Sequence, residues 1–180
     1  IRRSESQLAL DNETCLPHIS LAMGCVEREA VEPVRERIEA IASECPIGEL
    51  VITGVVTSLN ARGQSVSAFA IAKTGAVQGL HERVMDALQP YSSRDVTEAA
   101  MFGDETVAET TLAWIRDYRE KAAFAAFFPH ITIGYGMVEQ EMSFPIPLLA
   151  PRMALCHLGN HCTCRKVLAS APLAKSISAE

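Results

Sequence analysis

The chain has 180 residues, of which 48% are hydrophobic and 21% are charged, and this composition excludes an intrinsically disordered protein. Its net charge is -6 and its pI is about 5.4, which argues against binding to long nucleic acid, where basic patches supply most of the affinity. No stretch approaches the roughly 18 consecutive apolar residues of a membrane span, and no basic segment followed by an apolar one marks a secretory signal. We therefore expect a cytoplasmic protein with no membrane partner.

The first half of the chain predicts a strand, a helix and a hairpin. Residues 16–24 form the first strand candidate. Over residues 29–45 apolar side chains recur every three or four positions, which indicates a helix with one buried face. Residues 49–60 and 64–75 are rich in β-branched and small apolar side chains and are separated by a short turn, so they predict a hairpin.

The second half predicts two more helices, over residues 77–88 and 107–123, separated by a long loop. The remaining strand candidates are residues 129–136, 142–149, 152–158 and 161–169. Two prolines in residues 142–149 reduce that segment to an edge strand or a loop. This order of elements predicts an α+β architecture with mixed, largely antiparallel sheets in a single domain over residues 1–180.

Two short stretches, "LPHISLAMG" and "FFPHITIGYG", share the pattern Pro-His-apolar-Ser/Thr-apolar. Alternate residues of a strand lie on one face, so in each stretch the histidine and the hydroxyl residue would point the same way. The pairs are His18 with Ser20 and His130 with Thr132. A given histidine would have this setting by chance only roughly once in a thousand, and two of the five histidines have it. The repetition favours a joint function over two separate structural histidines.

Two imidazoles that face one cleft are suited to phosphoryl transfer. One ring takes a proton from the attacking hydroxyl or water while the other gives a proton to the leaving oxygen. Their ordinary pKa of about 6.5 populates both protonation states near neutral pH. The hydroxyls of Ser20 and Thr132 can donate hydrogen bonds to phosphate oxygens, so the chemistry needs neither a metal nor a cofactor.

The stretches "PHISL" and "PHITI" resemble the paired His-x-Ser/Thr-x motifs of the 2H phosphoesterase superfamily, which includes 2'-5' RNA ligase-like proteins and cyclic nucleotide phosphodiesterases. The resemblance implies a bilobal α+β fold in which two sheets, each carrying one motif strand, flank a central groove with helices outside. It implies metal-independent opening of 2',3'-cyclic phosphates, often to 2'-phosphates, or of 2'-5' bonds, and in some members their reverse formation. The substrate would be a small nucleotide or an RNA terminus. His18 and His130 would be the general acid and base, and Ser20 and Thr132 the phosphate ligands.

Two features depart from the pattern of that superfamily. Ser20 replaces the more usual threonine but keeps the hydroxyl. The superfamily places a strand and a helix before the first motif, whereas only 17 residues precede His18. We therefore expect either that those elements lie upstream or that one lobe is trimmed. The sequence leaves open which histidine is the acid, which phosphoester is the substrate and what the oligomeric state is.

The stretch "CHLGNHCTCR" offers zinc-ligand types, but its spacing differs from the usual paired Cys-x2-4-Cys knuckles. The alternatives to an enzyme are therefore a zinc-stabilised interaction domain and a non-catalytic module that binds a nucleotide or an RNA end. With no secretory signal, the six cysteines are expected to be reduced thiols rather than disulfides.

The same stretch contains a third His-x-Thr, at His161 and Thr163, beside the turn dipeptide Gly-Asn. We interpret it as the start of a hairpin strand rather than as a catalytic motif. From that strand Arg165 would either reach the phosphate or lie at a solvated strand end. Tyr135 would face away from Thr132 on an ideal strand, and Trp114 and most phenylalanines are expected in the core.

Overall fold

The computed structural model describes residues 10, 15–60, 63–104 and 106–174. Within them the chain forms three α-helices and eight β-strands, joined in part by short 3-10 turns. The helices are α1 (Val31–Glu44), α2 (Gly75–Leu88) and α3 (Glu109–Lys121). The strands are β1 (Cys25–Val26), β2 (Leu50–Leu59), β3 (Ser65–Ile71), β4 (Ser92–Ser93), β5 (His130–Tyr135), β6 (Ile146–Leu148), β7 (Arg152–Leu158) and β8 (Cys164–Pro172). The α+β class predicted from the sequence is confirmed.

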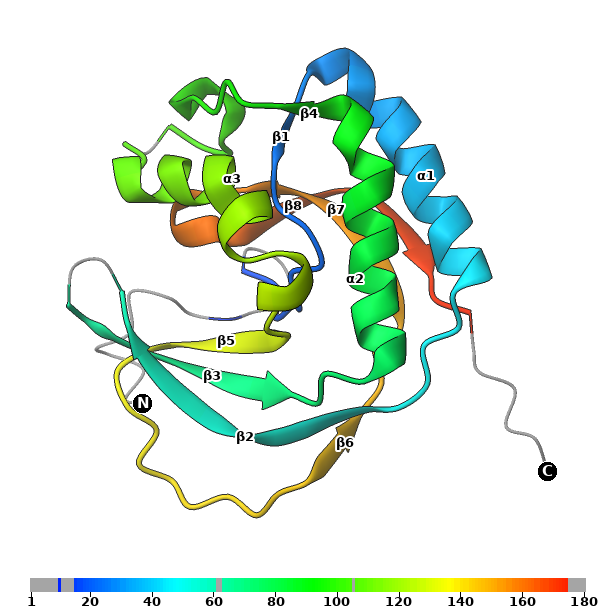
Figure 1. Ribbon diagram of the computed structural model, residues 1–180. Coiled ribbons are helices and arrows are strands. Elements are labelled where there is room, and N and C mark those ends of the chain that lie inside the picture. The colour runs from blue at the N-terminus through cyan, green and yellow to red at the C-terminus, as the bar shows by residue number, and fades with distance from the viewer. Residues whose placement is uncertain (1–9, 11–14, 61–62, 105, 175–180) are drawn as a thin grey trace.

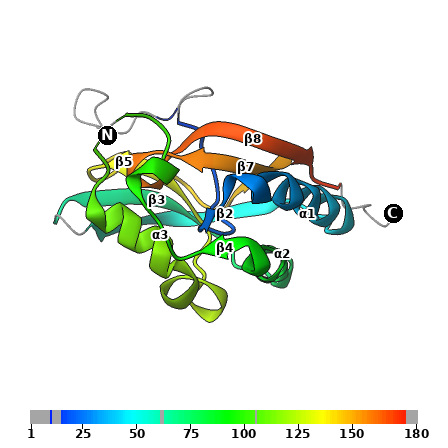
Figure 2. The same cartoon turned by 90° about the horizontal axis from the view of Figure 1, so that it is seen from above.

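Every strand pairing in the described residues is antiparallel. Strands β5, β3, β2 and β6 form a four-stranded sheet in that order, β7 and β8 form a hairpin, and β1 pairs with β4. The four-stranded sheet lies across the lower part of Figure 1, below α2 and α3. In Figure 2 the β7–β8 hairpin lies on one side of the molecule and α2 and α3 lie on the other. The four-stranded sheet and the β7–β8 hairpin are therefore separate sheets and form two layers.

The three predicted helices are confirmed because each buries its apolar stripe. In α1 the stripe includes Val34 and Ile38. In α2 it includes Leu80 and Val84, and that helix begins where the Thr74 hydroxyl accepts a hydrogen bond from a backbone N–H of the first turn. None of the helices in the described part of the chain combines the length and the apolar composition needed to cross a membrane.

The expectation that Trp114 is a core residue is wrong. The buried positions of α3 are Thr111, Leu112, Ile115 and Tyr118. Trp114 lies at the edge of that stripe and is 44% exposed. Two phenylalanines are also exposed, Phe102 and Phe128, whereas Phe127 is buried. Aromatic residues therefore divide between core and surface according to the face on which they fall.

The predicted hairpins are confirmed. Strands β2 and β3 pair along most of their length, and β7 and β8 pair from Arg152 to Leu158. The proline-containing segment contributes the edge strand β6, which pairs with β2 alone. An edge position tolerates Pro147 because one side of that strand has no neighbour to which a backbone N–H would donate.

The first predicted strand, residues 16–24, is wrong. No strand forms before Cys25 in the described residues, and the segment is joined to β8 by a backbone hydrogen bond from Leu16 N to Cys164 O of 3.3 Å. The reason is that its carbonyls accept hydrogen bonds from side chains instead of from a neighbouring strand. The Leu16 carbonyl pairs with His18, and the Leu21 carbonyl with a histidine of α2.

Two hydrophobic clusters meet at this irregular segment. One packs α1 and α2 against the β7–β8 hairpin, and the other packs α2 against the four-stranded sheet. Leu21 contacts both clusters. Full burial of one such aliphatic side chain contributes about 1.5–3 kcal/mol. The segment that carries the first histidine motif is therefore fixed between the two layers although it belongs to neither sheet.

Candidate active site

The second motif lies on β5, as the sequence predicts. His130 is paired with Ala70 and Thr132 with Ala68 on the neighbouring strand β3, so both side chains occupy one face of the sheet. A cavity of about 270 Å³ opens on this face. Its lining residues are Val56, Ser58, Val66, Ala68, Phe128, His130 and Thr132. The predicted pair from the second motif therefore lies in a cavity.

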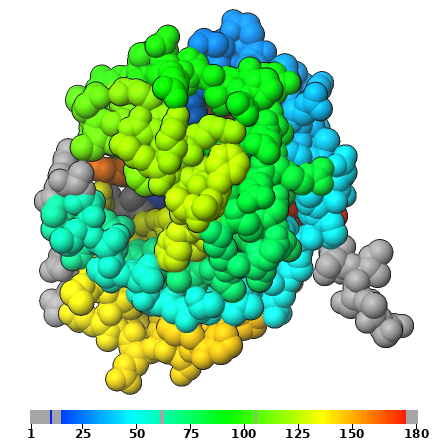
Figure 3. Space-filling view, viewed as in Figure 1, coloured from blue at the N-terminus to red at the C-terminus, as the bar shows by residue number. Residues whose placement is uncertain are grey.

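Figure 3 shows the surface hollowed beside the β2–β3 hairpin. Yellow atoms, the colour of the part of the chain that includes β5, border the hollow. The charge of His130 affects the pKa of His18, so the two motifs lie near each other although only the second is on a strand of the sheet.

A β-bulge places Tyr135 on the same face as the second motif. Thr132 pairs with Ala68 and Tyr135 pairs with Val66, so three residues of β5 span two of β3, and Ile133 is the extra one. Directly paired residues point to the same side of a sheet. The expectation that Tyr135 faces away from Thr132 is therefore wrong, because a bulge adds one residue and reverses the alternation beyond it.

Each motif histidine makes the same kind of local hydrogen bond. His18 Nδ1 lies 2.7 Å from the carbonyl oxygen of Leu16, and His130 Nδ1 lies 2.8 Å from that of Phe128. In each motif the acceptor lies two residues before the histidine, across the proline. A carbonyl can only accept, so in the neutral ring Nδ1 carries the hydrogen and Nε2 is left with its lone pair. The equivalence of the two motifs therefore extends from their sequence to their tautomers.

The two imidazoles are close enough to interact electrostatically. Burial lowers the pKa of His18 below its ordinary 6.5, the hydrogen bond to Leu16 opposes this, and the charge of His130 lowers the pKa further. A second like charge in the same recess is unfavourable, so the doubly protonated pair is disfavoured at neutral pH. Burial and the charge of His130 therefore favour the neutral form of His18.

Phe128 covers one side of His130. The two rings are stacked at 5.6 Å between centroids with an interplanar angle of 20°, and the Phe128 side chain is 50% exposed. Sequence reasoning missed this residue because it assigned phenylalanines to the core. The available signal was its position directly before Pro129, where β5 begins.

His18, Ser20 and Arg165 are not among the residues that line the cavity. The Ser20 carbonyl accepts a hydrogen bond of 3.5 Å from the Tyr118 hydroxyl. The stem of Arg165 lies across Gly159, where an added Cβ would be 2.5 Å from Arg165 Cγ. Only glycine permits this close approach. The roles predicted for Ser20 and Arg165 as phosphate ligands stay predictions.

The third His-x-Thr belongs to the turn of the β7–β8 hairpin, as the sequence predicts. The Thr163 hydroxyl donates to the carbonyl of Asn160 at 2.9 Å, and His161 has a positive φ of 59°. The His161 ring meets Tyr135 edge-on at 5.9 Å. This stretch therefore lies beside the end of β5, with its threonine hydroxyl used to close the turn.

No protein-family model matches the chain, and no curated protein matches its sequence.

None of the six cysteines forms a disulfide in the structure. A hydrogen bond between Cys156 and Cys164 raises the pKa of Cys164 and lowers that of Cys156, and burial raises the pKa of Cys162 to about 12. Within the part of the chain that the structure describes, no three His, Cys, Asp or Glu side chains are grouped as a metal ion would require.

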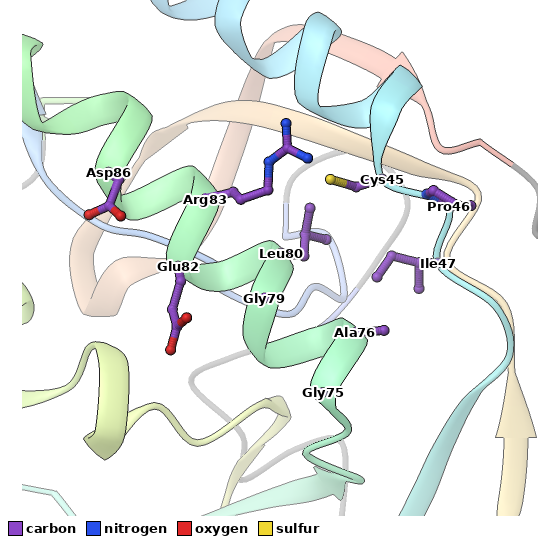
Figure 4. Close-up of a pocket in the computed structure, with 10 residues that line it drawn as sticks. All are labelled: Cys45, Pro46, Ile47, Gly75, Ala76, Gly79, Leu80, Glu82, Arg83 and Asp86. Carbon is purple, nitrogen blue, oxygen red and sulfur yellow. The ribbon is translucent and has the colours of Figure 1, made fainter.

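A larger cavity of about 460 Å³ lies elsewhere, between the end of α1 and the first turns of α2 (Figure 4). Its cation, Arg83, is paired with Glu44, and the side chains of Glu82 and Asp86 point away from the Cys45–Ile47 wall (Figure 4). None of the predicted site residues lines this cavity. Because its one lining cation is already paired, the smaller cavity at His130 is the better candidate for a phosphate site.

Proposed function

We propose that the protein is a metal-independent phosphodiesterase of the 2H type, which opens 2',3'-cyclic phosphates of small nucleotides or RNA ends to 2'-phosphates. The observation that carries the proposal is that His18 and His130 each make an equivalent hydrogen bond from Nδ1 to a backbone carbonyl. This leaves the Nε2 of both rings available for proton transfer. The superfamily resemblance adds the reaction class, and the layered α+β fold supports it.

His18 is the base in this mechanism because its pKa is lowered and it stays neutral. Its Nε2 accepts a proton from water as the water oxygen bonds to phosphorus. The bond from phosphorus to O3' breaks, and Nε2–H of His130 gives its proton to that oxygen. The product is a 2'-phosphate with a free 3'-hydroxyl. Thr132 donates a hydrogen bond to a non-bridging oxygen, and Ser20 is assigned the same role from the first motif.

The lining of the cavity defines the class of substrate. No lysine or arginine is among its described lining residues, so the site suits one phosphodiester charge better than a polyphosphate. Most of the wall is apolar, from Val56, Val66, Ala68 and Phe128, and can cover a nucleobase. The volume of about 270 Å³ is just below the usual range for small-molecule pockets, about 300–1,000 Å³. A single terminal nucleotide fits this description better than an extended strand.

Phosphorus NMR tests the proposal. Purified protein is incubated with a nucleoside 2',3'-cyclic phosphate in EDTA. We expect conversion to the 2'-phosphate by the wild type and no conversion by His130→Ala. His157→Gln is the matched control, because His157 bonds the Ala100 carbonyl outside the cavity and glutamine can do the same.

Three results would contradict the proposal. Conversion that EDTA abolishes would indicate a metal enzyme, and conversion that survives in His130→Ala would exclude the histidine mechanism. Tight binding of a 2'-phosphate without hydrolysis of the cyclic form would favour the non-catalytic binding module instead.

A further inference from the structure

His81 is a fully buried histidine that belongs to neither motif. It lies on α2 within the apolar stripe, four residues after Val77 and three before Val84, and its exposure is 0%. A polar ring at such a position must have both nitrogens satisfied to offset the loss of water.

Both ring nitrogens of His81 bind backbone. The N–H of Phe124 donates to Nε2 at 2.7 Å, and Nδ1 lies 2.6 Å from the Leu21 carbonyl. A backbone N–H can only donate, so Nε2 must be the acceptor and Nδ1 must carry the hydrogen. The surroundings therefore specify one neutral tautomer of His81.

The two partners of His81 lead to the two motifs. Leu21 follows His18 by three residues in the irregular segment of the first motif. Phe124 opens the turn that leads into β5 and His130. Between them, Phe127 stacks on the His81 ring at 3.9 Å with an interplanar angle of 2°. One side chain thus contacts the chain on both sides of the recess.

Other side chains from the same region hold the same turn. Gln78 Nε2 donates to the Phe124 carbonyl at 3.0 Å, and Lys73 Nζ donates to the Ala125 carbonyl at 3.1 Å. The turn needs these contacts because Phe124 has a φ of 56°, a conformation that is unfavourable for a residue other than glycine. The start of α2 and the turn at Phe124 are therefore held together as one unit. The hydrogen bond from His81 to the Leu21 carbonyl connects this unit to the first motif.

We propose that His81 is a positioning residue that sets the separation of His18 and His130. The inference rests on the proposed phosphodiesterase activity. In that reaction both rings must reach one phosphate at once, so a small displacement of either motif lowers the rate.

The link through His81 is also sensitive to acid. A proton on Nε2 would face the N–H of Phe124 and break that hydrogen bond. Burial lowers the pKa of His81, the bond to Leu21 and the charges of Glu82 and Asp86 raise it, and Lys73 lowers it. From α3, the Arg119 guanidinium lies over the Phe124 ring at 4.7 Å. The net direction is downward, so the link persists below the ordinary value of 6.5 and fails at more acidic pH.

The test compares His81→Phe with Val84→Ala. Phenylalanine keeps a ring against Phe127 but removes both hydrogen bonds, whereas Val84→Ala weakens the core of the same helix and leaves both hydrogen bonds of His81 in place. We expect the kcat of His81→Phe, corrected for folded fraction, to fall about 100-fold, with the activity of Val84→Ala close to that of the wild type.

A second readout needs no substrate. The pKa of His18 is measured by NMR with His130 present and after His130→Ala, first in the wild type and then in the His81→Phe background. We expect removal of His130 to raise the pKa of His18 in the wild type, and this coupling to shrink in His81→Phe. The NMR chemical shifts of the two ring nitrogens of His81 in the wild type should show Nδ1 protonated and Nε2 unprotonated.

The outcomes separate the two proposals. If His81→Phe keeps full activity and full coupling, or if Nε2 of His81 carries the hydrogen, the positioning role is wrong while the phosphodiesterase can still be correct. If the wild type opens no cyclic phosphate but the coupling is lost in His81→Phe, the positioning role holds and the proposed function fails. If His81→Phe does not fold, the nitrogen shifts of the wild type decide.

Discussion

The two histidine motifs reach the recess on different kinds of backbone. His130 lies at the start of β5, a strand whose backbone pairs with β3 in a four-stranded sheet. His18 lies in an irregular segment whose carbonyls accept hydrogen bonds from side chains of distant helices. Both rings nevertheless make the same bond to the carbonyl two residues earlier. The five-residue pattern therefore specifies how the ring is oriented, while the surrounding fold decides whether the segment is a strand.

Asparagine substitutions at the two histidines test most directly whether the two motifs are equivalent. The amide of His18→Asn or His130→Asn can still donate to the carbonyl two residues earlier, but it has no counterpart of Nε2. We expect each variant to lose about 100- to 10,000-fold in kcat with the fold retained, because each removes one proton transfer. Steady-state kinetics on a cyclic phosphate and a circular dichroism spectrum provide the check. If only one variant loses activity, the two motifs do not form a pair.

A glycine should be needed at position 134 of the second motif but not at the equivalent position of the first motif. The φ of 150° at Gly134 forms part of the bulge, whereas the equivalent position of the first motif is Ala22. We expect Gly134→Ala to destabilise the protein by about 1–3 kcal/mol, since a side chain is strained there. Urea unfolding provides the measurement. Gly54→Ala is the control, because a Cβ at that strand glycine meets nothing within 4 Å. Equal, small effects at both positions would contradict the bulge.

Acid should weaken the fold through the first motif. The folded-state pKa of His18 is lowered, so below about 6.5 the unfolded chain binds more protons than the folded one. Stability is therefore complete above that pH and falls as the pH drops toward the folded-state pKa. We expect His18→Asn to flatten this acid limb in unfolding experiments at pH 5 to 8. An unchanged pH dependence would indicate that His18 is not desolvated.

The smallest expected effect concerns the anchoring of the first motif by Tyr118. Burial raises the pKa of this tyrosine to about 12, so its hydroxyl stays a donor to the Ser20 carbonyl at neutral pH. We expect Tyr118→Phe to cost about 0.5 kcal/mol, the low end for a hydrogen bond, because the distance is 3.5 Å. Amide exchange over residues 16–24 should rise while exchange in β5 stays constant. A rise confined to β5 would contradict this assignment.

Local periodicity was enough to predict the helices and the hairpins. The stripe of α1, from Val34 to Ile41, and the paired runs of β2 and β3 depend on neighbours in the sequence. The second motif was predicted on its strand for the same reason. In each case the residues that determine the structure lie within one element or one turn of each other.

The remaining features depend on contacts that the sequence does not display. The first motif is irregular because its carbonyls bind His81 and Tyr118, which lie far along the chain. The Tyr135 side chain lies on the same face as Thr132 because Ile133 is one extra residue in the strand. No alternation of apolar and polar residues indicates this bulge. His81 itself could be suspected, since it is a polar residue on an apolar stripe, but its two backbone partners appear only in three dimensions.

The bond between each motif histidine and the carbonyl across its proline has a consequence for how such a site can arise and be moved. Many catalytic histidines are oriented by a carboxylate from another part of the chain, so two distant positions must be kept together. Here the orienting group is supplied by the backbone of the same short peptide. The unit can be duplicated, or transplanted by protein engineers to an unrelated scaffold, as a contiguous segment. Its ring will carry the correct tautomer wherever the local backbone is reproduced.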